Sequence, residues 1–406
     1  MTIGTPNESL LRSPSVDIHC YQGSEMERLV EEHRIVIAFG YLLRHYPVIR
    51  RKAAYLVMDL YDPFLLENLL MHNDLDMVRR EAVHESDLGV VIDQLRQADF
   101  FLCASERQRD YWLGALSMVN RVNPRSYAED PTLRRLIDVV PFGVPASRPQ
   151  ATGSAIRGDV PGIGPGDIVV LWGGGIWNWF DPLTAIRAVA AVTNEVRELR
   201  LYFMGLRHPN PELPEMDMAG RAVGLAQELG LLDRCVFFRN GWVPYEQRAN
   251  YLLAADLAVS LHQQHIETRF AFRTRLLDYL WAGLPVIATG GDVLSDEIAE
   301  QGAGLTVSEG NVDAVAAAFR ALARDPDRRR SMREQSLRLA AKHTWDRAAE
   351  PLLAYCRAPH RGHHGRSLEL GPERLPDRLR AAWQRSWMRR TASRIRRRLK
   401  GRPRRH

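Results

Sequence analysis

The sequence predicts an α/β protein in which two doubly wound domains are followed by a basic amphipathic helix. Three observations lead to this fold class. Short apolar strands alternate with helical patterns in both halves of the chain, which is typical of parallel sheets. Residues 145–167 are rich in Pro, Gly, Ser and Ala, and this composition indicates a boundary between two domains. The chain ends in an Arg-rich segment with a helical period of its own.

The length and composition agree with a globular protein of more than one domain. At 406 residues the chain is too long for one ordinary core, and its 45% hydrophobic and 26% charged residues are globular values. No apolar run reaches the ~18 residues that cross a bilayer, and the first residues lack the pattern of a secretory signal. The four cysteines lie far apart and have no metal-binding spacing. We therefore expect reduced thiols and no metal centre in a cytoplasmic protein.

Residues 1–150 are expected to form the first domain, on about four strands. The predicted strands are residues 35–39, 55–58, 100–103 and 137–140, and the helices are residues 64–71, 81–97 and 105–116. Asp59 and Asp62 follow the second of these strands and precede Pro63. Two carboxylates at this place could act on a substrate, although this pattern more often belongs to a turn or a helix cap.

Residues 151–356 are expected to form the second domain, on about six strands. The predicted strands are residues 168–172, 199–204, 235–238, 257–261, 286–289 and 305–307. One predicted helix begins at residue 181. Six others span residues 215–229, 245–254, 292–300, 312–323, 327–342 and 345–356. A further apolar helical segment lies just before Gly283 and Pro285, which would end it. The last two predicted helices would close this domain.

Three consecutive glycines, residues 173–175, follow the first strand of the second domain. Glycine permits close approach of the backbone to a ligand, and the helix that starts at Asp181 and Pro182 offers free amides to a phosphate. A plain tight turn would explain the glycines equally well. Aromatic residues gather beside them and favour a binding site: Trp172, Trp177, Trp179 and Phe180.

Acidic and basic residues are concentrated at the start of the helical segment that precedes Gly283. They are Glu267, Arg269, Arg273, Arg275 and Asp278. Arginines bind phosphates, carboxylates accept hydrogen bonds from sugar hydroxyls, and the helix N-terminus adds its own attraction for anions. A solvated charged turn is the alternative. Because a strand follows directly after Pro285, we expect the group at the rim of a sheet, where α/β proteins bind their ligands.

Residues 357–406 form a basic linker and tail. They carry 17 Lys and Arg against 3 Asp and Glu, a net charge of +14, which leaves −8 for the rest of the chain. Apolar residues recur at helical spacing between residues 375 and 399, and include Trp383 and Trp387. Arg-rich ends often bind nucleic acid. Two Trp on one apolar stripe favour an anionic membrane surface instead, so no nucleic acid partner is expected. The three histidines between residues 360 and 364 are expected to be solvated.

Several motifs together resemble glycosyltransferase family 4, the retaining GT-B enzymes that use nucleotide sugars. They are DVVPFGVP (138–145), GWVPY (241–245) and LDYLWAGLPVIAT (277–289). WGGGIWNWFDPLT (172–184) with ETRFAFRTR (267–275) also resembles a bacterial branch linked to cell-surface polysaccharides. The resemblance covers roughly residues 35–356 and implies two Rossmann-like domains.

The resemblance also implies roles for individual residues. Asp278 takes the place of the acid that holds the ribose hydroxyls, and Glu267 that of the acid that touches the transferred sugar. Trp242 and Val243 stand where the family's backbone contacts the base. Gly174 and Gly175, with Trp177 nearby, stand in the loop under the pyrophosphate. Asp62 lies near the first-domain position that often carries a His or Asp close to the reacting sugar.

The sequence departs from the family pattern at three places. Ten residues separate Glu267 from Asp278, three more than in the family. The family's Arg and Lys after the first strand of the second domain are absent, and we predict that Arg273, assisted by Arg269 or Arg275, supplies their charge. The first domain is shortened at its N-terminus, with about four strands where the family usually has six or seven.

The resemblance implies transfer of a hexose from a nucleotide diphosphate sugar, with retention, to a cell-surface glycan or lipid-linked acceptor. The donor is a substrate, and neither a further cofactor nor a metal ion is implied. The tail helix would hold the protein peripherally at the inner face of the plasma membrane. The alternative is a truncated, inactive relative that binds a nucleotide sugar or a partner protein without turnover. An epimerase or phosphorylase on the same fold is disfavoured, because the acid–base set of the one and the cofactor lysine of the other are not found.

Overall fold

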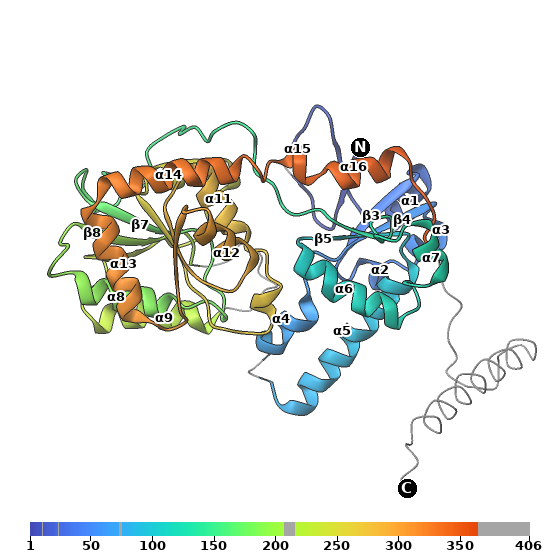
Figure 1. Cartoon of the computed structure of the whole chain (residues 1–406), viewed down its shortest axis with the longest axis horizontal. Helices are drawn as coiled ribbons and strands as arrows, with labels where there is room; N and C mark the ends of the chain where they lie inside the picture. The colour runs from blue at the N-terminus through green and yellow to red at the C-terminus, as the bar shows by residue number, and fades with distance from the viewer. Residues whose placement is uncertain (10, 23, 73–74, 207–215, 364–406) are drawn as a thin grey trace, which may run out of the picture. The chain divides into compact units, whose positions relative to one another are not determined.

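The first domain is built around a parallel sheet of four strands in the order β3-β4-β5-β6 (Figure 1). The computed structural model describes residues 1–9, 11–22, 24–72, 75–206 and 216–363. The elements of this domain are β1 (Thr2–Thr5), β2 (Asp17–Cys20), α1 (Glu25–Glu32), β3 (Ile35–Phe39), α2 (Leu42–His45), α3 (Val48–Lys52), β4 (Tyr55–Asp59), α4 (Phe64–Met71), α5 (Met77–Gln97), β5 (Phe100–Cys103), α6 (Glu106–Met118), α7 (Pro124–Glu129) and β6 (Ile137–Val139). The four predicted strands are therefore confirmed, and the pair β1–β2 and helices α1 to α3 and α7 were not predicted.

The second domain contains a parallel sheet of six strands in the order β12-β11-β10-β7-β8-β9. Its elements are β7 (Ile168–Trp172), α8 (Pro182–Val192), β8 (Leu199–Phe203), α9 (Asp217–Glu228), β9 (Val236–Phe238), η1 (Tyr245–Gln247), α10 (Arg248–Leu253), β10 (Leu257–Ser260), η2 (Glu267–Arg269), α11 (Thr274–Ala282), β11 (Val286–Thr289), α12 (Val293–Glu300), β12 (Gly304–Val307), α13 (Val312–Arg324) and α14 (Pro326–Ala340). The strand order reverses between β10 and β7. In doubly wound sheets ligands bind at the carboxyl ends of strands at such a point.

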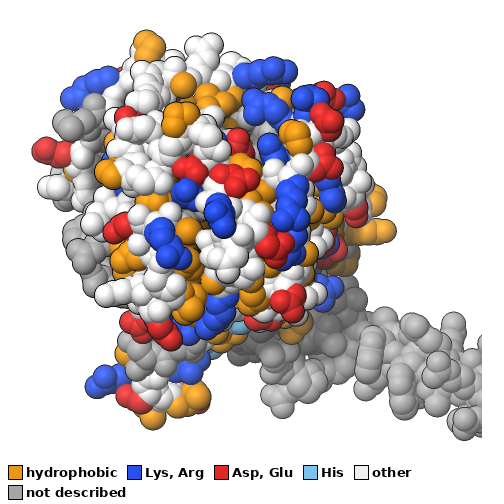
Figure 2. Space-filling model, turned by 90° about the vertical axis from the view of Figure 1, so that its left-hand side faces the viewer, with side chains coloured by type: hydrophobic (Ala, Val, Ile, Leu, Met, Phe, Trp, Pro, Cys, Tyr) orange, Lys and Arg blue, Asp and Glu red, His pale blue; other side chains and the backbone are white. Residues whose placement is uncertain are grey.

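Alternate residues of the six-stranded sheet face two separate cores. Val170 and Trp172 pack with α8, α9 and α13 on one face, whereas Val169 and Leu171 pack with α10, α11, α12 and α14 on the other. Strands buried on both faces need continuous apolar sequence, so these strands stand out in the sequence as short apolar runs. The face turned to the viewer in Figure 2 mixes acidic and basic side chains with scattered hydrophobic ones.

The end of the described chain returns to the first domain, in α15 (Trp345–Ala348) and α16 (Glu350–Arg357) (Figure 1). Tyr355 of α16 stacks on Phe100 of β5, with ring centroids 4.5 Å apart, and packs with Val57 and Leu102. These strand residues face away from the first domain's main core and would otherwise be exposed. The prediction that residues 345–356 close the second domain was therefore wrong.

Two segments predicted as linkers are partly packed against the domains. Ile156 and Ile163, within residues 145–167, are buried in the core of the second domain. Beyond α16, His360 Nε2 lies 2.8 Å from the carbonyl oxygen of Arg135, and His363 Nε2 lies 2.7 Å from Glu129 Oε2. Both histidines therefore contact the first domain, and His363, with a side chain that is 40% exposed, is still open to solvent as expected. His364 and the predicted tail helix lie outside the described residues.

Replacing Tyr355 by alanine tests the placement of α16. The ring is 4% exposed, and we expect its loss to lower the free energy of unfolding by about 3 kcal/mol, as for other buried aromatic truncations. Leu353 on the same helix is 45% exposed, so its replacement by alanine is the matched control. Urea unfolding measures both variants, and equal small effects would contradict the packing described here.

Candidate active site

The glycine loop lies at the carboxyl end of β7 and is held close to α11. The Gly173 amide donates a hydrogen bond of 2.7 Å to Tyr279 Oη, and a Cβ at Gly173 would lie 2.8 Å from a carbon of the Tyr279 ring. Gly174 has φ +83°, a conformation that side-chain-bearing residues rarely adopt. The loop therefore needs glycine for its close approach to α11 as well as for its backbone conformation.

A pocket of about 270 Å³ opens beside this loop, and we call it the donor pocket. It is lined by Gly173, Gly174, Gly175, Trp177, Met204, Gly205, Trp242, Val243, Tyr245, Arg248, Leu252, Thr274, Arg275, Asp278 and Tyr279. Seven of the eight residues predicted to bind the donor are thus brought together. Arg269 is the exception, because it is exposed and lines neither this pocket nor the second one described below.

Arg275, the second residue of α11, places a guanidinium group against the glycine loop. Its Nη2 donates a hydrogen bond of 2.9 Å to the carbonyl oxygen of Gly175, and the group lies over the Phe180 ring, 4.0 Å from the centroid. Nη1 is buried and has no hydrogen-bond partner among the described residues. Burial lowers the pKa of Arg275 to about 10, so it stays charged at neutral pH. A buried cation with an unused donor beside a glycine loop suits a phosphate.

Asp278 lies on the same face of α11, one turn after Arg275. It accepts a hydrogen bond of 3.2 Å from Arg248 Nε. Burial raises its pKa, and the charge of Arg248 opposes this rise. Arg248 in turn stacks on Tyr245, with its guanidinium carbon 3.6 Å from the ring centroid. The carboxylate is therefore held in place at the wall of the donor pocket.

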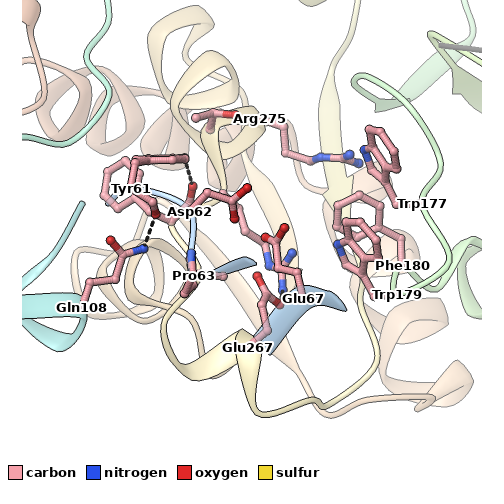
Figure 3. A pocket seen from close by; sticks show the side chains of 14 residues that line it. Tyr61, Asp62, Pro63, Glu67, Gln108, Trp177, Trp179, Phe180, Glu267 and Arg275 are labelled. Atoms are coloured by element: carbon pink, nitrogen blue, oxygen red, sulfur yellow. Dashed lines mark hydrogen bonds and ion pairs between the residues drawn. The ribbon is translucent and has the colours of Figure 1, made fainter. Parts of the chain in front are cut away.

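A second pocket of about 180 Å³, which we call the acidic pocket, contains three carboxyl groups (Figure 3). It is lined by Tyr61, Asp62, Pro63, Glu67, Gln108, Trp177, Trp179, Phe180, Glu267, Ala271, Phe272, Arg273, Thr274 and Arg275. Trp177, Thr274 and Arg275 line both pockets, which therefore meet at the N-terminus of α11. In Figure 3 the carboxyl groups of Asp62, Glu67 and Glu267 lie near one another, opposite Trp177, Trp179 and Phe180.

The first-domain wall of the acidic pocket is fixed by hydrogen bonds to the second domain. Tyr61 Oη donates to the Phe272 carbonyl oxygen at 2.6 Å. Gln108 Nε2 lies 2.7 Å from the Tyr61 carbonyl oxygen and 2.9 Å from that of Phe270. These contacts place Asp62, the next residue along the chain, beside the segment that carries Glu267.

Arg273 belongs to a buried ionic group behind the acidic pocket. Its Nη2 lies 3.2 Å from Glu267 Oε2, and its Nε lies 3.6 Å from Asp292 Oδ2. His262 Nε2 lies 3.4 Å from the same Asp292 oxygen. Burial alone would raise the pKa of Asp292, but the nearby His262 and the charge of Arg273 lower it below its usual value. The charge of Arg273 is thus matched by two acids. Arg275 is therefore the better candidate for the pyrophosphate-binding role that was predicted for Arg273.

Replacing Asp292 by alanine is expected to destabilise the protein strongly. Asp292 is fully buried, and its Oδ1 also caps α12 by accepting a 2.9 Å hydrogen bond from the Ser295 amide. Removing it leaves Arg273 without one of its two counter-charges, which costs about 3 kcal/mol or more. Glu300 is exposed on the same helix, and Glu300→Ala is the control. Urea unfolding measures both variants. If Asp292→Ala lowers the free energy of unfolding no more than the control does, Asp292 does not stabilise the protein through the buried ionic group.

Glu67 is the pocket residue that the sequence analysis missed. It lies on α4, hydrogen-bonds with Asp62, and burial raises its pKa to about 9. A sequence signal was present, since Pro63 ends the loop after β4 and α4 begins at the next residue. A carboxylate in the first turns of that helix lies close to whatever binds at the loop. The predicted strand-end acid Asp59 does not line either pocket.

Comparisons with known proteins agree with this geometry. Residues 167–338, which span β7 to α14, match the sequence model of the family described as Glycosyl transferases group 1. D-inositol 3-phosphate glycosyltransferases from Nocardia farcinica and Segniliparus rotundus are each 29% identical, over 62% and 58% of this chain. The chain spans about half the length of these relatives, 54% and 49%.

Solved structures of low sequence identity share the fold. WaaG, a glycosyltransferase involved in lipopolysaccharide biosynthesis, is 16% identical with a TM-score of 0.57, covering 88% of this chain and 91% of its own. Anabaena Alr3699/HepE in complex with UDP-glucose is 15% identical with a TM-score of 0.58, covering 84% and 86%. The chain therefore has the GT-B fold, and residues 167–338, within its second domain, are similar to the glycosyl transferases group 1 family.

Proposed function

We propose that this protein moves a hexose from a nucleotide diphosphate sugar, with retention, to a cell-surface glycan or lipid-linked acceptor. One observation carries the proposal. The donor pocket, with its glycine loop and buried Arg275, meets the acidic pocket at Trp177 and Thr274. A sugar attached to a diphosphate beside the loop would extend toward the carboxyl groups of the second pocket.

Each side of the donor has a proposed partner. The pyrophosphate lies at Gly174 and Gly175, where Arg275 and the N-terminus of α11 supply positive charge. Asp278 accepts hydrogen bonds from the ribose hydroxyls, and the base lies against Trp242 and Val243. Support comes from the solved relative Alr3699/HepE, whose complexes contain UDP and UDP-glucose.

Catalysis in this scheme is mainly electrostatic. Negative charge develops on the leaving pyrophosphate, and a preorganised buried cation stabilises it more than water would. Glu267, held by Arg273, positions the transferred sugar, and Asp62 lies on the acceptor side. The scheme uses no protein nucleophile and no cofactor besides the donor substrate.

The proposal is tested by calorimetric titration of the protein with UDP-, GDP-, ADP- and dTDP-sugars. One of these donors should bind and, with an acceptor, should be consumed. A folded sample that binds none of them contradicts the proposal. Donor binding with neither transfer nor slow donor hydrolysis would instead support the alternative of a binding protein without turnover.

We also propose that residues 375–399 attach the protein reversibly to an anionic membrane surface on its cytoplasmic side. The support is the sequence pattern, an apolar stripe with Trp383 and Trp387 among many arginines. No helix in the described part of the chain is long and apolar enough to cross a bilayer.

The membrane proposal predicts binding to vesicles that contain phosphatidylglycerol. Replacing both Trp383 and Trp387 by alanine is expected to weaken this binding at least about tenfold, because the apolar contribution is lost. Ser386→Ala is the control in the same segment. Vesicle flotation measures all three proteins, and equal binding of the double variant and the control would contradict the proposal.

A further inference from the structure

The acidic pocket holds more carboxyl groups than its basic side chains balance. Of its two arginines, Arg273 already lies 3.2 Å from Glu267 and 3.6 Å from Asp292, so its charge is matched by two acids. Arg275 donates to the carbonyl oxygen of Gly175 and lines the donor pocket, where its charge is assigned to the diphosphate. Once a donor is bound, neither arginine has charge left for a second anion.

Asp62 and Glu67 are the two carboxyl groups that the first domain contributes to the pocket. The two side chains hydrogen-bond with each other, and in the described part of the chain neither forms an ion pair with a basic side chain. Burial raises the pKa of both, that of Glu67 to about 9, so Glu67 keeps its proton at neutral pH. Glu67 is half-buried and Asp62 is exposed at the edge of the pocket. Two carboxyl groups that line the same pocket repel each other when both are charged, so together they favour one proton and one negative charge.

The opposite wall of the pocket is aromatic. The rings of Trp177 and Trp179 are stacked, with centroids 5.4 Å apart and planes 10° from parallel, and Phe180 lies beside them. Figure 3 shows these rings across the pocket from Asp62, Glu67 and Glu267. Aromatic faces pack well against the C–H faces of a sugar ring, and they offer no charge to an anion.

We propose that the first-domain side of the acidic pocket, at Asp62 and Glu67, takes an uncharged, polyhydroxylic acceptor next to the transferred sugar at Glu267, and that Glu67, with Asp62, excludes phosphorylated or carboxylated acceptors. This inference rests on the proposed transferase function and adds the class of acceptor. A hydroxyl group can donate to the Asp62 carboxylate and accept the Glu67 proton, which satisfies both side chains. A phosphate there would lie beside a like charge with no free cation. The repulsion would favour uncharged acceptors over phosphorylated ones.

The test uses matched pairs of ligands that differ only in a phosphate. Binding of glucose and glucose 6-phosphate, and of galactose and galactose 6-phosphate, is measured on the full chain by ligand-detected NMR, with and without UDP. Each hexose is expected to bind at least about tenfold more tightly than its phosphate, the ratio that a modest like-charge repulsion produces. Equal or tighter binding of the phosphates, or no hexose binding at all, overturns the proposal.

Two substitutions of Glu67 assign the effect to this side chain. Glu67→Gln keeps the charge of the pair, because Glu67 is already protonated, and should retain the preference for the unphosphorylated hexose. Glu67→Lys supplies the missing cation. It should reduce the ratio between the dissociation constants of the hexose phosphate and the hexose at least about tenfold. An unchanged preference in Glu67→Lys contradicts the proposal, and UDP titration shows that each variant is folded. Failure of the transferase function would show separately, as missing donor consumption with the hexose preference intact.

Discussion

Replacing Arg275 by alanine is expected to weaken nucleotide diphosphate binding by about 10- to 100-fold, the range for a lost hydrogen bond to a charged group. Arg275 faces the glycine loop, its Nη1 has no other partner in the described structure, and its guanidinium is withdrawn from solvent. A phosphate bound there meets a cation that water does not screen. Calorimetric titration with UDP measures the effect. Titration with uridine should show little change, because uridine has no phosphates.

Arg269 provides the matched control for this prediction. It lies on the same short segment but is exposed and lines neither pocket. Arg269→Ala should therefore leave UDP affinity unchanged. A loss of affinity in Arg269→Ala or Arg273→Ala, with none in Arg275→Ala, would show that the wrong arginine has been assigned to the pyrophosphate.

Replacing Glu267 by glutamine is expected to lower kcat about 100-fold while UDP affinity changes little. Glu267 is 4% exposed, lines the acidic pocket and does not line the donor pocket. Its carboxylate is fixed by Arg273 at 3.2 Å, and an amide there would lose the charge that holds both side chains. A small misplacement of a group that positions the reacting sugar costs about two orders of magnitude in rate.

Steady-state kinetics with the donor identified by titration separate the two effects of Glu267→Gln. A fall in kcat with an unchanged UDP dissociation constant is the expected result. An unchanged kcat would remove Glu267 from the transfer step. Equal losses of kcat and UDP affinity would indicate that the substitution disturbs the whole N-terminus of α11.

The sequence predicted the second domain well because its local signals agree with its packing. Gly283 ends α11 in the left-handed conformation, with φ +71°, and Pro285 then leads into β11. The helix after it begins at a capping Asp292. Each of these signals acts within a few residues, so no knowledge of the tertiary structure was needed to place the elements.

The return of α16 to the first domain could not be predicted in this way. The spacing of apolar residues in α16 indicates a helix with one buried face, but it does not say which sheet that face covers. The apolar residues Val57, Phe100 and Leu102 lie on the second face of the first sheet, and α16 buries them through Tyr355. Such long-range complementarity is absent from any local pattern.

The candidate site was predicted in outline, and its charge pairs were not. The glycine loop and Asp278 line the donor pocket as expected. Arg273 and Arg275 are only two residues apart, and the first helical turn of α11 directs them to different partners, Glu267 and the Gly175 carbonyl. Glu67 comes from the first domain, as Asp62 does, so its proximity to Glu267 depends on how the two domains pack.

The position of the donor's pyrophosphate tests the account most directly. It is read from a crystal structure of the protein with the nucleotide sugar that binds in titration. We predict that the pyrophosphate contacts the Gly174–Gly175 backbone and Arg275, with the sugar directed toward Glu267. A diphosphate bound at Arg273, or away from the glycine loop altogether, would contradict it.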